Sequence, residues 1–271
     1  MKHIITIDID GTILNKHGKI SKYTYNVIHK LIDLGHIVVL ATGRPLSGAI
    51  SIYNDLGLKT PIITDNGACI DHPLDEKFIK QRTYMPLSVM HDLFKHAKPW
   101  LKTAFFNIEK TVYAYQYDPR LEAIFSGLNQ AEVVEKDFDQ IFEQPSGLIF
   151  LINPEYKHDL ETYIQNKHGQ LISYRLWGED HDYAVYEIYL KHVSKSSAIS
   201  YLLNYYQIDR SKWIAFGDGI NDIEMISDAF LGVAMKNAYP ELLSYCDDMT
   251  SYTHVDDGVA KYLVKYFKLN E

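Results

Sequence analysis

The sequence predicts an α/β protein in which a Rossmann-like, doubly wound parallel sheet is interrupted by an inserted α+β domain. Three observations predict this fold. Short apolar runs alternate with helical stripes near the start of the chain, aromatic-rich strand patterns fill the middle, and the first pattern returns after Leu190. With 271 residues and 46% hydrophobic content, the chain fits one large domain or two modest ones.

The N-terminal stretch predicts the order strand, helix, strand, helix, strand. A first strand is expected over His3–Ile9, and Ser21 is a suitable N-cap for the helix that follows. Ile37–Ala41 is a continuous apolar run, typical of a strand that is buried on both faces of a parallel sheet. Pro45 suits the first position of a second helix, and Pro61–Thr64 predicts the third strand.

The middle of the chain has a different pattern, with many strands and only two helices. Helices are expected at 87–96 and 154–167, and strands at 103–106, 111–115, 147–152, 171–177 and 183–188. About 100 residues are enough for an independent core, which favours a separate domain over ordinary insertions. We therefore expect an α+β domain at 84–187, inserted into a core formed by 1–83 and 188–271.

After Leu190 the alternating pattern resumes. Ser194 is a suitable cap for a helix, and Trp213–Phe216 and Leu231–Ala234 predict two further strands with a helix between them. The final helix is expected to begin near Asp257 and to end near Phe267. These elements complete the predicted doubly wound core.

Composition argues against several classes of partner. The net charge of −8 makes binding to nucleic acid or to an anionic membrane surface unexpected. Cys69 and Cys246 form neither a disulfide framework nor a metal-binding spacing. The apolar run near the N-terminus is too short for a signal peptide, and no run approaches the roughly 18 residues that span a bilayer. We therefore expect a cytoplasmic protein, with monomer and homodimer both open.

Acidic residues follow two of the predicted strands. Asp8 and Asp10 lie at the end of the first strand, and Asp218 and Asp222 follow the strand that ends at Phe216. Open parallel sheets build their sites outside the carboxyl ends of the strands. Carboxylates held close together repel one another unless a cation joins them, and Mg²⁺ prefers oxygen ligands. The pattern indicates a Mg²⁺ site for phosphoryl transfer, held by Asp8 and Asp218 with Asp222 nearby.

Three polar residues occur at other strand ends on the same predicted edge. Thr42 follows the second strand, and Asn66 follows the third. Arg44 comes after the turn at Thr42, where it either contacts substrate or forms a structural salt bridge. Asn66 is explained equally well as a substrate contact or as a turn residue.

Four short motifs occur in order along nearly the whole chain. They are Asp8-Ile9-Asp10-Gly11-Thr12, Ala41-Thr42-Gly43-Arg44, Lys195, and Gly217-Asp218-Gly219-Ile220-Asn221-Asp222. Together with the tail segments 232–238 and 256–259, they resemble the haloacid dehalogenase (HAD) superfamily of phosphatases. Within it, the chain is similar to the Cof-type subgroup, subclass IIB with a C2-type cap. One departure is Ser196-Ser197 after the lysine, where the family often has glycine.

The resemblance implies roles for the acidic residues. Asp8 would be the nucleophile that forms an aspartyl-phosphate, and Asp10 the general acid–base. Mg²⁺ would be bound by Asp8 and Asp218, with Asp10 contributing its backbone carbonyl rather than its carboxylate. Asp222 would either complete the ligand shell or pair with Lys195.

The resemblance also implies phosphate-binding residues and an activity. Thr42, backbone N–H groups near Gly43, Lys195 and Asn221 would bind the phosphoryl oxygens or orient the ligands. The implied function is a Mg²⁺-dependent phosphatase acting on a small phosphorylated metabolite, namely a sugar phosphate, pyridoxal phosphate or a flavin-pathway phosphate. A phosphomutase and a non-catalytic regulator that binds a phosphorylated ligand are the alternatives.

Overall fold

The computed structural model describes residues 2–118 and 132–269. Internal contacts divide the chain into two compact units. The first unit comprises Met1–Arg44, Ala49–Gln81 and Ser194–Glu271, and the second comprises Pro45–Gly48 and Arg82–Val193. Residues 119–131, which belong to the middle domain expected from the sequence, lie outside the described residues.

The first unit contains a five-stranded parallel sheet with the order β14-β13-β12-β1-β2, which confirms the predicted doubly wound core. Its strands are β1 (Ile4–Ile7), β2 (Ile37–Leu40), β12 (Trp213–Gly217), β13 (Leu231–Ala234) and β14 (Asp248–Met249). Within the sheet, Ile7 of β1 is paired with Leu40 of β2 on one side and with Phe216 of β12 on the other. This register brings the residues that follow β1, β2 and β12 to the same edge of the sheet.

A small three-stranded sheet adjoins β2. It consists of β3 (Ile62–Thr64), β4 (Cys69–Asp71) and β5 (Gln81–Arg82). A parallel bridge between Ala41 and Ile63 attaches β3 to the end of β2. The third predicted strand is therefore present, but the chain then turns back at Asp65–Gly67 and pairs antiparallel with β4, which the sequence did not reveal.

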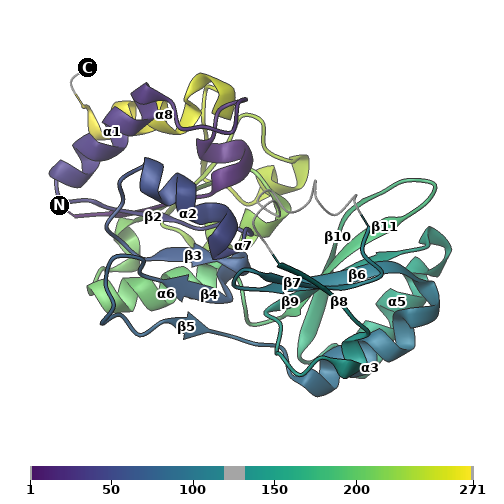
Figure 1. Cartoon of the computed structure of the whole chain (residues 1–271). Coiled ribbons are helices and arrows are strands. Elements are labelled where there is room, and N and C mark those ends of the chain that lie inside the picture. The colour runs from purple at the N-terminus through teal and green to yellow at the C-terminus, as the bar shows by residue number, and fades with distance from the viewer. Residues whose placement is uncertain (1, 119–131, 270–271) are drawn as a thin grey trace. The chain divides into compact units, whose positions relative to one another are not determined.

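Helices cover both faces of the parallel sheet. They are α1 (Lys22–Asp33), α2 (Leu46–Asp55), α6 (Lys195–Tyr206), α7 (Ile223–Asp228) and α8 (Gly258–Phe267). The paired helices α1 and α8 lie on one face and α6 on the other (Figure 1). Successive residues of β12 point to opposite faces of the sheet. Ala215 belongs to the same hydrophobic cluster as Ile199 of α6, whereas the rings of Phe216 and of Tyr262 in α8 have their centroids 5.4 Å apart.

Both predicted N-caps of the first unit are confirmed. The Ser21 hydroxyl accepts a hydrogen bond from the backbone N–H of Thr24. Ser194 forms a capping box with Ser197, in which each side chain accepts from the other residue's backbone N–H. Ser197, one of the two serines that follow Lys195, thus helps to fix the start of α6.

The second unit is an α+β structure built on a six-stranded sheet with the order β10-β11-β9-β6-β7-β8. Its strands are β6 (Leu101–Ile108), β7 (Thr111–Tyr115), β8 (Glu132–Glu135), β9 (Gly147–Ile152), β10 (Ile172–Glu179) and β11 (Ala184–Leu190). Neighbouring strands are antiparallel except β7 and β8. The sequence did not reveal β8.

Two helices, α3 (Leu87–Ala97) and α5 (Lys157–Tyr163), pack on one face of that sheet. The ring centroids of Phe94 in α3 and Tyr115 in β7 lie 5.0 Å apart. Glu161 of α5 accepts a hydrogen bond from the Tyr186 hydroxyl of β11. The aromatic residues of the middle segment therefore contribute to sheet packing.

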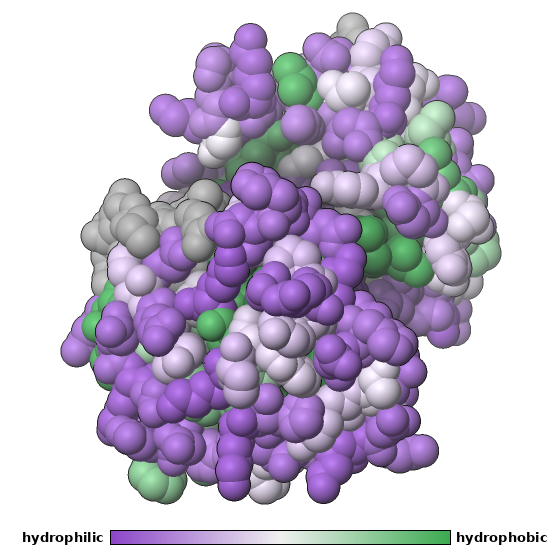
Figure 2. Space-filling view, turned by 90° about the vertical axis from the view of Figure 1, so that its right-hand side faces the viewer, coloured by the Kyte–Doolittle hydropathy of each residue, from purple (hydrophilic) through white to green (hydrophobic). Residues whose placement is uncertain are grey.

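Hydrophilic residues cover most of the face seen in Figure 2, with apolar residues scattered among them. Across 2–118 and 132–269, no helix combines the length and apolar character that crossing a bilayer requires.

Candidate active site

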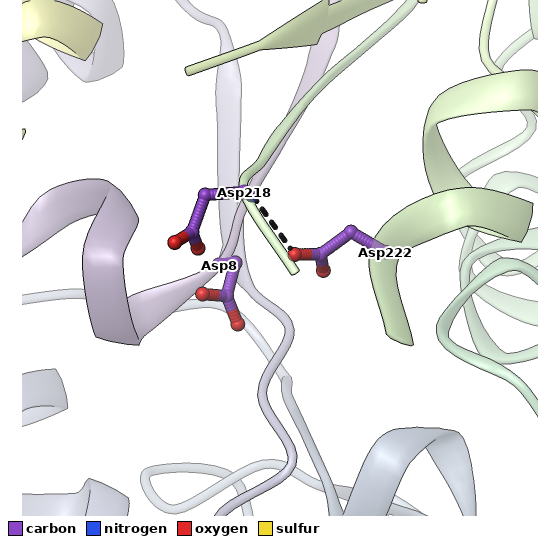
Figure 3. Close-up of side chains that lie close together, drawn as sticks. All are labelled: Asp8, Asp218 and Asp222. Carbon is purple, nitrogen blue, oxygen red and sulfur yellow. Dashed lines mark hydrogen bonds between the residues drawn. The ribbon is translucent and has the colours of Figure 1, made fainter. Parts of the chain in front are cut away.

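Three aspartates converge where β1 and β12 end. Ligand oxygens of Asp8, Asp218 and Asp222 all lie within 4.8 Å of one another (Figure 3). Asp8 follows β1 directly, and Asp218 follows the adjacent parallel strand β12. Asp222 returns to the same place after one tight turn over Ile220–Asp222. The parallel register thus joins two acidic motifs that are far apart in the sequence.

A buried lysine lies between two of these carboxylates. Lys195, the first residue of α6, is 0% exposed, and its Nζ lies 2.6 Å from both Asp8 Oδ1 and Asp222 Oδ1. Burial alone would lower the pKa of this ammonium group, but the charges of Asp222 and Asp8 outweigh burial and raise the pKa above its ordinary value. Lys195 is therefore a fixed positive charge inside the site.

Asp222 is fully engaged by protein groups. Its Oδ1 accepts from Lys195, and its Oδ2 accepts from the backbone N–H groups of Asp218 and Gly219 at 3.0 Å each. Of the two roles left open by the sequence, the structure shows the pairing with Lys195. Asp222 also holds the loop that carries Asp218.

Asp8 and Asp218 have the properties of cation ligands. Asp8 Oδ1 accepts from Lys195, whereas Asp8 Oδ2 has no hydrogen-bond partner among the residues that the structure describes. Burial raises the pKa of Asp8 well above its ordinary value, against the lowering effect of Lys195. Burial and the charge of Asp222 raise the pKa of Asp218 to about 7. Three carboxylates against one ammonium leave negative charge in the site, so this set of oxygens fits a divalent metal ion.

Gly11 permits the close approach of the first motif to Asp218. Its φ of +69° lies in the left-handed region, and a Cβ built there would lie 2.0 Å from Asp218 Oδ2. The next residue, Thr12, donates its hydroxyl hydrogen to Asp218 Oδ1 at 3.0 Å. The turn over Ile9–Ile13 therefore packs directly against the Asp218 carboxylate.

We expect Gly11→Ala to disrupt metal binding, with Gly18→Ala as the matched control. Gly18 has a similar φ of +67°, but no atom lies within 4 Å of its added Cβ. Both substitutions should cost about 1–2 kcal/mol of stability through left-handed strain, measured by denaturant unfolding. Only Gly11→Ala also displaces Asp218 and should abolish measurable Mg²⁺ binding in calorimetry. Equal Mg²⁺ affinity in the two variants would contradict the close-approach argument.

The carboxylate of Asp10 lies outside the three-aspartate cluster. Arg44 Nε donates to Asp10 Oδ2 at 2.6 Å and Arg44 Nη2 donates to Asp10 Oδ1 at 2.5 Å, while the Asp10 side chain is 58% exposed. Of the two explanations for Arg44, this structure shows the salt bridge. A metal contact by Asp10 through its backbone carbonyl stays a prediction.

The remaining predicted residues meet beside Gly43. Asn221 Nδ2 donates to Asn66 Oδ1 at 2.8 Å, and a Cβ built on Gly43 would lie 3.0 Å from that same Asn66 oxygen. Thr42 is buried, and its hydroxyl accepts from the backbone N–H of Arg44 at 3.1 Å. The loops after β2, β3 and β12 are therefore in contact, although their role in binding phosphate stays a prediction.

Sequence reasoning missed two residues that contact this cluster. Thr12 belongs to the first motif, but its pattern indicates only a turn. Asn237 lies in the loop after β13, where its Nδ2 donates to the Gly11 carbonyl at 2.8 Å and lies 3.5 Å from Asp218 Oδ2. It belongs to the tail segment 232–238 that contributes to the family resemblance, but that pattern assigns it no role and does not indicate this contact, because the partner residues are remote along the chain.

Comparison with known proteins agrees with the geometry. The family model of haloacid dehalogenase-like hydrolases matches residues 5–263. The 5-amino-6-(5-phospho-D-ribitylamino)uracil phosphatase YitU of Bacillus subtilis is 30% identical over 269 residues, which is 98% of each chain.

Two solved structures share the fold. TM0651 from Thermotoga maritima has a TM-score of 0.80 and 25% identity, covering 100% of this chain and 98% of its own. The HAD subclass IIB sugar phosphatase BT4131 has a TM-score of 0.81 and 21% identity, covering 98% of this chain and 99% of its own. With a family match across nearly the whole sequence and carboxylates gathered at the strand ends, the chain belongs to the haloacid dehalogenase-like hydrolases and is a Cof-type phosphatase.

Proposed function

We propose that this protein is a Mg²⁺-dependent phosphatase that hydrolyses a small phosphorylated metabolite through an aspartyl-phosphate at Asp8. The observation that carries the proposal is the state of the Asp8 carboxylate. It is buried, one oxygen is fixed by Lys195 and the other has no partner among the described residues, and Asp218 lies beside it. An oriented carboxylate with one available oxygen is suited to in-line attack on phosphorus.

In the proposed first step, an Asp8 oxygen bonds to phosphorus as the bond to the leaving alkoxide breaks. Asp10 gives the alkoxide a proton, and in the second step it takes a proton from the water that attacks the aspartyl-phosphate and releases phosphate. In this structure the Asp10 carboxylate is held by Arg44 in an ion pair. For Asp10 to take part in either proton transfer, that pair would have to open and free its carboxyl group.

The metal would be bound by Asp8 and Asp218, with the backbone carbonyl of Asp10 as a third contact. When bound, Mg²⁺ supplies positive charge that offsets the charge of the phosphoryl oxygens during transfer. Lys195 supplies a second positive charge, and Asp222 keeps it in place. Thr42, Gly43 and Asn221 would bind the phosphoryl oxygens.

We propose a flavin-pathway phosphate as the first substrate to test, ahead of sugar phosphates and pyridoxal phosphate. The support is the 30% identity over the whole chain with a relative named for a phosphoribitylamino-uracil substrate. Residues 84–187 would act as a cap domain that selects the rest of the substrate molecule.

A substrate panel with free phosphate as readout tests this proposal. Protein treated with a chelator should release no phosphate from any substrate, and added Mg²⁺ should restore release. Mg²⁺ at 100 times its Kd should also stabilise the fold by about 2.7 kcal/mol, seen as a higher Tm.

Two results of the same panel would contradict the proposal. Isomerised products without free phosphate would identify a phosphomutase. Tight binding of a phosphorylated ligand without any Mg²⁺-dependent turnover would identify a regulator.

A further inference from the structure

Asn237 connects the loop after β13 to both sides of the proposed metal site. Its Nδ2 lies 2.8 Å from the carbonyl oxygen of Gly11 and 3.5 Å from Asp218 Oδ2. The first contact has the length of a strong hydrogen bond, and the second is a weak one. The Asn237 side chain thus contacts both Gly11 of the first acidic motif and the Asp218 carboxylate of the motif at 217–222.

The orientation of the Asn237 amide is determined by its surroundings. The backbone N–H of His254 donates to Asn237 Oδ1 at 3.0 Å. Because an N–H group needs an acceptor, the oxygen end of the amide must face His254, and the NH₂ end must face Gly11 and Asp218. The amide therefore presents a hydrogen-bond donor to the site.

The backbone around Asn237 is fixed to the same strand end. The N–H of Met235 donates to the Gly217 carbonyl, and the N–H of Tyr239 donates to the Asp218 carbonyl, both at 2.9 Å. Asn237 lies between these two anchors. Its side chain is therefore held in register with Asp218 by the main chain on both sides.

A closed circuit of contacts results. Asn237 bonds the carbonyl of Gly11, the adjacent Thr12 donates to Asp218 Oδ1, and Asp218 Oδ2 faces Asn237 again. Thr12 and Asn237 thus bind opposite oxygens of one carboxylate, and the peptide between Gly11 and Thr12 links them. Each donor therefore restrains the Asp218 carboxylate or the Gly11 turn, and loss of either donor should remove that restraint.

We propose that Asn237 is a positioning residue for the metal site: it holds the Gly11 turn against Asp218, and thereby sets the affinity for the metal. The inference rests on the proposed function, because it assumes that Asp8 and Asp218 bind Mg²⁺. Residues that orient metal ligands in this way typically change metal affinity or activity by about 10–100-fold when removed.

The test uses Asn237→Ala and Asn237→Leu in the full chain after chelator treatment. Leu is close to Asn in size but has no hydrogen-bond donor. Asn237→Leu therefore distinguishes the loss of the amide hydrogen bonds from the loss of side-chain volume. Calorimetric titration with MgCl₂ should show a Kd raised by about 10-fold or more in both variants. In phosphate-release assays, the Mg²⁺ concentration needed for half-maximal rate should rise similarly, and saturating Mg²⁺ should restore most of kcat.

Tyr53→Phe is the matched control for a purely structural role. It removes one partly buried hydrogen bond of the same unit, from the Tyr53 hydroxyl to the Thr60 carbonyl at 2.8 Å. It should lower Tm and leave the Mg²⁺ Kd unchanged.

The outcomes separate this inference from the proposed function. Wild-type Mg²⁺ affinity in Asn237→Leu, with or without a lower Tm, would overturn the inference alone. Absence of Mg²⁺ binding by the wild-type protein would overturn the proposed metal site and, with it, this inference.

Discussion

Asp8→Asn should lower the rate of phosphate release by about 10⁵-fold, the order of magnitude expected when a covalent nucleophile is removed. The amide of asparagine cannot attack phosphorus, and Asp222, the other carboxylate bound to Lys195, has both oxygens engaged by protein donors. Mass spectrometry of the quenched reaction should find a phosphorylated protein for the wild type and none for the variant. Substantial residual turnover would contradict the nucleophile assignment.

The fold should survive this substitution. Burial raises the pKa of Asp8, which means that its ionised form is costly in the folded protein. The neutral amide of the Asp8→Asn variant removes that cost, and Lys195 keeps Asp222 as its partner. We therefore expect an unchanged or higher Tm without metal, which distinguishes lost chemistry from lost structure.

Lys195→Met should lower the free energy of unfolding by about 3–5 kcal/mol in the absence of metal. The ammonium group is the shared partner of two buried carboxylates, and its removal leaves Asp8 and Asp222 facing each other without compensation. Denaturant unfolding measures the loss, and phosphate release should also be abolished because the site loses its fixed positive charge.

Lys16→Met is the control for the general effect of replacing a lysine. Lys16 is exposed, so the change should stay within about 0.5 kcal/mol. Added Mg²⁺ should recover part of the stability lost in Lys195→Met, because a cation beside Asp8 replaces some of the missing charge. A Lys195→Met variant as stable as the wild type would show that the ion pairs are not important for the fold.

Local patterns predicted those parts of this protein that depend on local sequence. The strands β1, β2, β12 and β13 are short, mostly apolar runs, so they could be recognised. The caps Ser21 and Ser194 act on their own helices and were also recognisable. The meeting of Asp8 with Asp218 followed from one general rule about parallel sheets.

Features that depend on remote partners were not predictable. The strands β5 and β14 have two residues each, too few to show a periodic pattern. Arg44 had two equally good explanations until Asp10 was seen beside it. Asn237 gains its role only from Gly11 and His254, which contact it in the folded chain and not in the sequence.

The position of β1 between β2 and β12 has a consequence for how the protein matures. One edge of β1 pairs with β2 soon after both are synthesised, but the other edge pairs with β12, in the register Ile4 with Trp213. During synthesis on the ribosome, the backbone groups on the β12 side of β1 have no strand partner until the whole of the second unit has been made. The second unit can collapse first from its own contacts, whereas the aspartates of the site meet only when nearly the entire chain has been made.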